Sequence, residues 1–193
     1  MNEYFSHHTS IIDNGAVIGK NTKIWHFSHI CSGAVIGEDC KFGQNVYIGG
    51  KVQIGNNVKI QNNVSVYDGV ILEDNVFCGP SMVFTNVFNP RCEIIRNDMS
   101  AYRKTLVKKG ASIGANATIV CGITIGKYAF VGAGSVVTKD IPDFGMVYGN
   151  PAKQRSWICR CGEKLIKKNE SEFECKICSK KYFMLDGLLQ EIL

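Results

Sequence analysis

Four cysteines near the C-terminus have the spacing of a metal site. They form a Cys-x-Cys pair and, after thirteen intervening residues, a Cys-x-x-Cys pair: Cys159, Cys161, Cys175 and Cys178. Two close thiolate pairs of this kind can complete the tetrahedral ligand set of a structural zinc ion. Within residues 156–193, the ribbon segment of about 25 residues holds too little apolar content for us to expect folding without the metal. We predict a small zinc ribbon here, ended by a short amphipathic helix over 184–193.

Composition predicts a cytoplasmic protein with small-molecule partners. Five further cysteines are scattered along the chain, which is typical of a reducing compartment rather than of a disulfide framework. Residues 1–8 have neither the basic nor the apolar part of a secretory signal. No apolar run reaches the roughly 18 residues that span a membrane. The net charge, 22 − 17 = +5, is below what we expect of a nucleic-acid-binding protein.

A six-residue repeat organises most of the sequence. Twelve positions at steps of six are all apolar: Ile18, Ile24, Ile30, Ile36, Phe42, Ile48, Ile54, Ile60, Val66, Leu72, Cys78 and Phe84. A second series follows in a new register: Ile113, Ile119, Ile125, Val131 and Val137. The step from Phe84 to Ile113 is not a multiple of six, because 113 − 84 = 29. We therefore expect an inserted loop over 85–110.

The repeat has the signature of a triangular coil of strands. A small or β-branched residue stands two positions before the apolar ones, and glycine often follows them. An α-helix of period 3.6 cannot keep a six-residue stripe on one face, and a lone strand of period two needs no fixed glycines. A coil with three sides of six residues satisfies both features and pairs in parallel with the next coil. We predict an all-β parallel β-helix over 1–155, although the period alone does not define its handedness.

Basic residues are concentrated in the inserted loop. The loop contains two acidic residues, Glu93 and Asp98, and six basic ones, so it carries +4 of the chain's net charge of +5. The basic residues are Arg91, Arg96, Arg103, Lys104, Lys108 and Lys109. Long loops in compact repeats are usually functional or disordered, and the aromatic residues Phe88 and Tyr102 lead us to expect order. An ordered basic loop suits a ligand with phosphates or carboxylates. A solvated loop without a ligand is the alternative.

Long segments between Ile18 and Ala152 resemble one family of enzymes. The matching segments are Ile24–His29, Gly43–Val46, Lys59–Tyr67, Val76–Asn86, Thr105–Val107 and Gly110–Ile119. They resemble the hexapeptide-repeat family, and within it the bacterial sugar-nucleotide N-acetyltransferases. The most similar enzymes acetylate the 3-amino group of UDP-2-acetamido-3-amino-2,3-dideoxy-glucuronate for surface-polysaccharide (lipopolysaccharide) synthesis. The resemblance implies a left-handed β-helix, a homotrimer and acetyl-CoA as the donor.

The resemblance also implies an acceptor site beside the insertion. Asn86 matches an asparagine that contacts the sugar near the reacting amine. Independently, the separation of Asn86 from Asp68, 86 − 68 = 18, is three hexapeptides, so the two should stack at one corner of adjacent coils. We predict both as catalytic residues, with Asp68 orienting the sugar or its ammonium group; turn residues that cap their own backbones are the alternative. The predicted substrate-binding residues are Tyr67, Arg91, Arg103 and Lys104.

The donor site is implied by resemblance too. In this superfamily CoA lies in the groove between two subunits along the last coils. Small residues there let the pantetheine approach the backbone, and lysines can meet its phosphates. The predicted CoA-binding residues are Gly110, Ala111, Asn116, Ala129, Lys127, Lys139 and Pro151.

The sequence departs from its relatives in lacking one histidine. Ile113-Gly114-Ala115-Asn116 has Asn116 where many hexapeptide O-acetyltransferases have a catalytic histidine, and all four histidines, at 7, 8, 26 and 29, precede the insertion. A free amine is already nucleophilic, and the proton of the adduct can pass to the departing CoA thiolate. We predict substrate-assisted transfer in which the enzyme supplies proximity and oxyanion hydrogen bonds. His26 or His29 as the base is the alternative.

Three other functions stay open. The same chemistry on a dTDP-3-amino-3,6-dideoxyhexose would need no partner for a carboxylate. A γ-type carbonic anhydrase has the same coil but needs three histidines placed to bind zinc at the trimer interface. No histidine lies in the later coils of this chain. A β-helix that is only a scaffold has no reason to interrupt its repeat. Binding of CoA separates the scaffold from the transferases.

Overall fold

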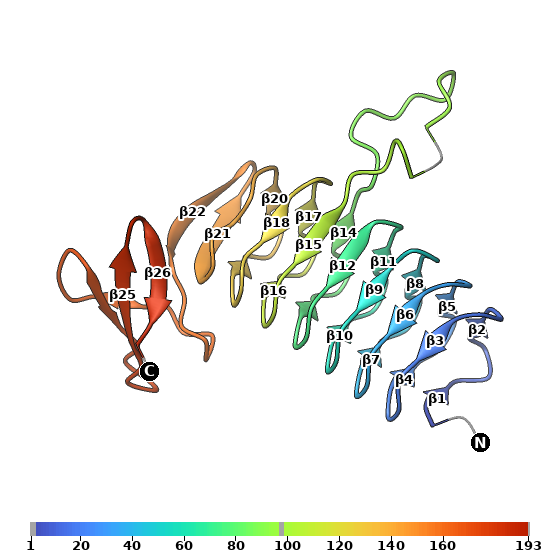
Figure 1. Cartoon of the computed structure of the whole chain (residues 1–193), viewed down its shortest axis with the longest axis horizontal. Coiled ribbons are helices and arrows are strands. Elements are labelled where there is room, and N and C mark those ends of the chain that lie inside the picture. Colours follow the sequence, from blue (N-terminus) through green and yellow to red (C-terminus); the bar gives the residue numbers. More distant parts are fainter. Residues whose placement is uncertain (1–2, 97–98, 193) are drawn as a thin grey trace.

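The protein is a β-helix of three sheets joined to a small antiparallel sheet. The computed structural model describes residues 3–96 and 99–192. In Figure 1 the coils follow one another from β1 to β22, and the small sheet lies beyond the last coil. The described residues form strands and turns, and they include no helix long and apolar enough to cross a membrane.

Each side of the coil is one parallel sheet. Sheet A contains β1 (Phe5–Ser6), β4 (Lys23–Ile24), β7 (Lys41–Phe42), β10 (Lys59–Ile60), β13 (Phe77–Cys78), β16 (Ser112–Ile113), β19 (Phe130–Val131), β21 (Gly145–Gly149) and the antiparallel β22 (Ala152–Trp157). Sheet B contains β2 (Ile11–Ile12), β5 (His29–Ile30), β8 (Tyr47–Ile48), β11 (Ser65–Val66), β14 (Val83–Phe84), β17 (Thr118–Ile119) and β20 (Val136–Val137). Sheet C contains β3 (Val17–Ile18), β6 (Val35–Ile36), β9 (Gln53–Ile54), β12 (Val70–Leu72), β15 (Thr105–Val107) and β18 (Thr124–Ile125).

The strand register confirms the predicted coil of three hexapeptides. Lys23 pairs with Lys41 and Lys41 with Lys59, so each coil advances the sequence by three steps of six. The apolar residue of nearly every hexapeptide points inward and is buried, as Ile24, Phe42 and Ile60 are. Each such side chain contributes about 1.5–3 kcal/mol relative to an exposed one. The stacked parallel coils are consistent with the left-handed form.

The corners of the coil need backbone with positive φ. We name the three edges of the coil by the sheets that meet there: AB, BC and CA. On the CA edge the corner residues at positive φ are Asn21, Asp39, Asn57, Asn75, Gly110, Tyr128 and Phe144. Asparagine, aspartate and glycine enter this region most easily, which explains the first five. The two aromatic residues at the end of the series need another explanation.

We expect Asn57→Ala to lower the free energy of unfolding by about 1–2 kcal/mol, because alanine carries a Cβ into the left-handed region. The variant also loses the hydrogen bond of 2.7 Å from the Asn57 amide to Asn75 Oδ1. Asn57→Gly loses the same bond without the steric cost, so it should destabilise less. Denaturant unfolding of both variants measures the difference, and equal effects would show that the conformation of this corner contributes nothing.

The insertion leaves the coil at the BC edge, between β14 and β15. Its neck is closed by an antiparallel bridge between Val87 and Tyr102. The chain is back in the coil at Thr105, which pairs with Val70 of β12. The insertion is therefore shorter than the expected 85–110. The available signal was Val107, which lies six positions before Ile113 and already belongs to the second apolar series.

The C-terminal helix predicted over 184–193 is wrong. The tail is a four-stranded antiparallel sheet of β23 (Ile166–Lys167), β24 (Glu172–Glu174), β25 (Lys181–Leu185) and β26 (Leu188–Glu191). Asp186 and Gly187 have positive φ and form the turn between β25 and β26, as expected of an Asp-Gly hairpin. This local turn signal outweighs the helical spacing of the leucines. Leu193 lies outside the described residues.

Candidate functional site

All the predicted acceptor residues except Arg91 lie along the BC edge. The registers of β14 on β11 and of β15 on β12 place Asn86 and Arg103 on the coil that follows Asp68. The Arg103 amide donates to the Asn86 carbonyl over 2.9 Å, which closes the base of the insertion. Asp68 Oδ1 accepts a hydrogen bond of 2.9 Å from the Lys51 amide. Asp68 thus stabilises the preceding turn through Oδ1. Its other carboxylate oxygen, Oδ2, takes no part in that hydrogen bond.

The insertion holds Arg103 against the coil. The Arg103 guanidinium carbon lies 4.3 Å from the centre of the Phe88 ring, a cation–π contact. Its aliphatic part packs on Gly122, where an added Cβ would lie 3.1 Å from Arg103 Cδ. Arg103 and the exposed Lys104 therefore bring positive charge to the edge that carries Asn86. Arg91 is farther out, where its backbone forms a bridge with Ile94.

The outer part of the insertion carries an apolar hollow of about 650 Å³. It is lined by Val87, Pro90, Arg91, Cys92, Ile94, Ile95 and Arg96. Ile95 is 83% exposed and Ile94 is 52% exposed. Two neighbouring isoleucines on a projecting loop (Figure 1) form a surface that favours contact with another chain.

A row of rings on sheet B leads to the same edge. The ring centres of His29 and Tyr47, and of Tyr47 and Tyr67, are both 5.9 Å apart. The hydrogen bond with the Cys31 thiol, followed by burial, raises the pKa of Tyr47 to about 12. Its hydroxyl is therefore neutral near pH 7. Tyr67, the predicted substrate-binding residue, is 39% exposed and is nearest to the insertion.

All four histidines lie away from the insertion. His29 is separated from the coil of Val83 by three steps of the register, or about 14 Å at the usual strand spacing. Its Nε2 is 3.2 Å from Asp13 Oδ1. His26 is on the AB edge, and its ring centre lies 3.6 Å from that of His7. Burial, followed by the charges of His26 and His8, lowers the pKa of His7.

The predicted donor residues are distributed over all three edges. Ala111 and Ala129 are buried and fill the core two positions before an inward apolar residue. Asn116 is an AB corner residue with φ of 56°, so the turn itself accounts for this asparagine. Gly110 is covered by Tyr128, whose Cε1 would lie 2.3 Å from an added Cβ. Coil packing therefore explains these small residues without a ligand.

The other donor residues are accessible. Lys127 is exposed on the CA edge, and its amide donates to Asp143 Oδ1 over 2.8 Å. Lys139 and Pro151 line a hollow of about 290 Å³ at the end of the BC edge, together with Lys153. We name it the end hollow. Two lysines beside a small hollow are suited to a phosphate-bearing ligand.

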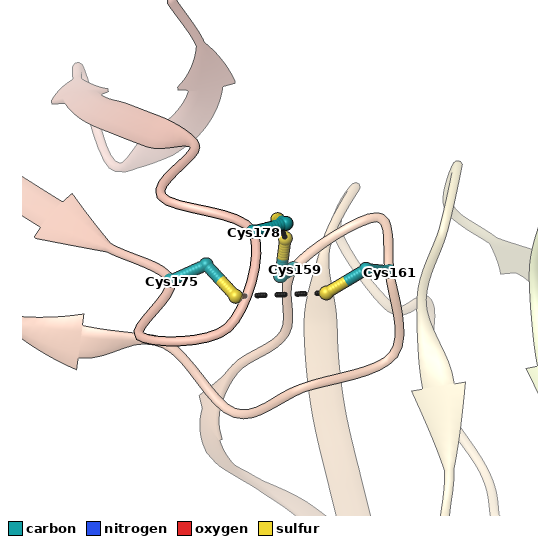
Figure 2. Close-up of side chains that lie close together, drawn as sticks. All are labelled: Cys159, Cys161, Cys175 and Cys178. Atoms are coloured by element: carbon teal, nitrogen blue, oxygen red, sulfur yellow. Dashed lines mark hydrogen bonds between the residues drawn. The ribbon is translucent and has the colours of Figure 1, made fainter.

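The four cysteines of the tail converge, as Figure 2 shows. Their sulfur atoms all lie within 4.8 Å of one another. The Cys159–Cys178 and Cys161–Cys175 sulfur distances are 3.4 and 3.5 Å, close to the edge of about 3.8 Å that follows from tetrahedral Zn–S bonds. Burial raises the pKa of Cys159 and Cys161, whereas at Cys175 hydrogen bonds from the Cys178 and Ile177 amides and from the neighbouring thiols outweigh burial and lower the pKa to about 7. The donor set therefore fits a zinc ion.

The coil, the insertion and the end hollow together define a β-helix of the transferase class, and known proteins agree. The chain matches the model of the bacterial transferase hexapeptide over residues 15–50 and 104–139, and that of the hexapeptide repeat of succinyl-transferase over 33–68. It is 46% identical over 189 residues to the dTDP-3-amino-3,6-dideoxy-alpha-D-galactopyranose 3-N-acetyltransferase of Aneurinibacillus thermoaerophilus, covering 98% of this chain and 95% of that one.

Solved structures share the fold. One is a variant of the GDP-perosamine N-acetyltransferase of Caulobacter crescentus with CoA and GDP-perosamine, at TM-score 0.53 and 21% identity, covering 80% of this chain and 58% of that one. Another is a hexapeptide-repeat acetyltransferase of Vibrio cholerae with acetyl-CoA, at TM-score 0.52 and 24% identity, covering 74% and 70%. The chain belongs to the hexapeptide-repeat family of bacterial transferases, and within it to the acetyl-CoA-dependent sugar N-acetyltransferases.

Proposed function

We propose that the protein transfers the acetyl group of acetyl-CoA to the 3-amino group of a dTDP-linked 3-amino-3,6-dideoxyhexose. The observation that carries this proposal is the 46% identity, over nearly the whole of both chains, to an enzyme named for that reaction. This acceptor replaces the UDP-linked uronate that the sequence first favoured. Unlike the uronate, this hexose has no carboxylate, so its site needs no arginine to pair with one.

The reaction exchanges one acyl bond for another. The amine nitrogen attacks the thioester carbonyl, the C–S bond breaks, and the CoA thiolate takes the proton that the nitrogen loses. Asn86 positions the sugar near its amine, and Arg103 with Lys104 meets the diphosphate. The remoteness of His29 and His26 from the BC edge at the insertion supports transfer without a histidine base.

A panel of acceptors tests this proposal. With purified protein and acetyl-CoA, we expect kcat/KM for a dTDP-3-amino-3,6-dideoxyhexose to exceed that for the UDP-linked amino uronate by about tenfold or more. Release of the CoA thiol measures the rate, and mass spectrometry of the product locates the acetamide. A preference for the UDP-linked uronate would overturn the choice of acceptor.

We infer one structural zinc ion per chain in the four-cysteine site. Cys159, Cys161, Cys175 and Cys178 would hold it with four thiolates, a set that leaves no open position for catalysis. The small sheet around them buries Tyr182 and Leu189 but few other large side chains. A metal centre supplies the stability that such a core lacks. The alignment with the Aneurinibacillus enzyme covers 98% of this chain, so the tail is matched as well.

We also infer that the protein works in the cytoplasm as a homotrimer. All nine cysteines lie in the part of the chain that the structure describes, and all are free thiols there, which suits a reducing compartment. The exposed isoleucines of the insertion favour burial by a neighbouring copy. In a cyclic trimer the insertion of one chain could meet the edge of the next, so that both build the site.

Sedimentation velocity tests the trimer. The chain mass is 21.3 kDa, and we expect a single species of three times that mass. Ile95→Asp places a charge in the surface that we expect to be buried, and should shift this species toward monomer with loss of activity. Lys59→Asp, on the exposed face of sheet A, is the matched control. A stable and active monomer would contradict the inference.

A further inference from the structure

The CA edge changes its chemistry where the tail begins. Its corner residues at positive φ are Asn or Asp in the first four coils, followed by Gly110. The last two are Tyr128, with φ of 55°, and Phe144, with φ of 61°. A bulky residue in this region costs free energy. Some interaction of the two aromatic side chains must therefore offset the cost.

That interaction is a clamp on the tail. The rings of Tyr128 and Phe144 are stacked with centres 5.5 Å apart, and Phe144 meets Tyr182 of β25 edge-on at 5.3 Å. The Arg160 guanidinium carbon lies 5.1 Å from the centre of the Tyr128 ring. We call Tyr128, Phe144, Tyr182 and Arg160 the aromatic clamp. It joins the last coils directly to the four-cysteine site, because Arg160 is the residue between Cys159 and Cys161.

Hydrogen bonds also hold the tail in one orientation on the last coils. The Tyr182 hydroxyl lies 3.1 Å from Cys159 Sγ and accepts a bond of 3.0 Å from the Arg160 amide. The Ile158 amide donates to the Phe144 carbonyl over 2.9 Å. Tyr182 is fully buried. The clamp is thus a packed core shared by the coil and the tail, so it orients the small sheet on the coil.

This orientation places β26 beside the end hollow. A second hollow of about 640 Å³ lies between the coil and the tail, and Leu188, Leu189 and Gln190 of β26 form one wall. It shares Asp140, Ile141 and Pro142 with the end hollow. The two hollows therefore adjoin, and we treat them together as one groove with Lys139 and Lys153 at one end and β26 at the other.

The acidic residues of this groove already have partners. Asp140 Oδ1 accepts a bond of 2.7 Å from the Thr124 amide. Asp143 Oδ1 accepts one of 2.8 Å from the Lys127 amide and is 4.0 Å from Lys108 Nζ. The amides stabilise the two carboxylates in their present orientations, and Lys108 places one positive charge beside Asp143. Leu188 is 55% exposed and offers an apolar surface to a flat ring.

We propose that the tail is part of the acyl-donor site, with β26 as the wall against which the adenosine end of acetyl-CoA packs and the aromatic clamp as the device that holds this wall in place. The proposal rests on the proposed acetyl-CoA-dependent function. Leu188 would meet the adenine ring, and Lys139 with Lys153 would meet the phosphates. The thioester end of acetyl-CoA would lie on the BC edge near Asn86. The tail would therefore affect the binding of acetyl-CoA and not the acetyl-transfer step.

The variant Tyr128→Asn tests the clamp without harming the coil, because Asn is the residue at three earlier corners of the same edge. We expect faster amide hydrogen exchange in β24 and β25, about tenfold weaker binding of CoA by calorimetry, and a higher KM for acetyl-CoA. The value of kcat at saturating donor should stay within about threefold of wild type. Phe27→Asn is the matched control, since Phe27 has φ of 56° on the AB edge, away from the tail.

The second variant, Leu188→Glu, tests the wall with the clamp intact. A carboxylate at this exposed position replaces the apolar contact with the adenine ring and should weaken CoA binding by about tenfold, with hydrogen exchange of the tail unchanged. If wild-type affinity for CoA persists in both variants while the protein still acetylates its sugar, the proposal is overturned and the proposed function stands. If the wild-type protein neither binds CoA nor acetylates any amino sugar, the proposed function itself fails.

Discussion

Replacement of Asn86 by alanine is expected to lower kcat/KM for the amino sugar by roughly tenfold to more than a hundredfold. The variant removes the hydrogen bond that we propose Asn86 makes near the reacting amine, and such a bond contributes on the order of 1–3 kcal/mol. Asn86 is held at the base of the insertion by the bond of 2.9 Å between its carbonyl and the Arg103 amide, which alanine retains. The fold should therefore persist. Steady-state kinetics on the folded variant measures the loss.

Three further variants serve as controls for this result. Asn89→Ala changes an exposed asparagine farther out on the same insertion and should leave the rate near that of wild type. His26→Ala and His29→Ala should each cost much less than Asn86→Ala. An indispensable general base would instead cost about 10²–10⁴-fold in kcat. A loss of that size in either histidine variant, with Asn86→Ala near wild type, would contradict substrate-assisted transfer.

Loss of zinc is expected to unfold the tail and leave the β-helix intact. Native protein should hold about one zinc ion per chain, and Cys175→Ser should hold much less. Binding of zinc to such thiolate sets is coupled to folding and contributes roughly 10–16 kcal/mol in small peptides. Cys175 is buried among the other three thiols, so serine leaves an incomplete ligand set. Metal analysis and amide exchange of β23–β26 measure the two effects.

The matched control is Cys92→Ser, which changes an exposed cysteine in the insertion and should keep the zinc. Acidification should release the metal, because protons compete for the thiolates. Acetyl transfer should continue in part after chelation, with a raised KM for acetyl-CoA. Native protein without zinc would disprove the metal site. Complete loss of turnover at saturating acetyl-CoA, with the coil still folded, would disprove a purely structural role.

Local pattern alone determined the β-helix. Side chains spaced by six, in one series from Ile24 to Phe84 and in a second from Val107 to Val137, can be buried together only in a coil with three sides, so the period predicts both the sheets and the register of three hexapeptides per coil. The adjacency of Asp68 and Asn86 follows from the same arithmetic. The convergence of the four cysteines also follows from spacing, because two short pairs of thiols on turns have few ways to arrange themselves.

Tertiary structure decided what the period does not describe. The Asp186-Gly187 turn is a local signal for the last hairpin, whereas the burial of Tyr182 and Leu189 in that hairpin depends on how the tail packs. Ala111 and Ala129 are small because the core beside them is full. Tyr128 and Phe144 are large because the tail packs on their corner. The sizes of these four side chains depend on contacts between residues far apart in the chain, and a local pattern carries no information about such partners.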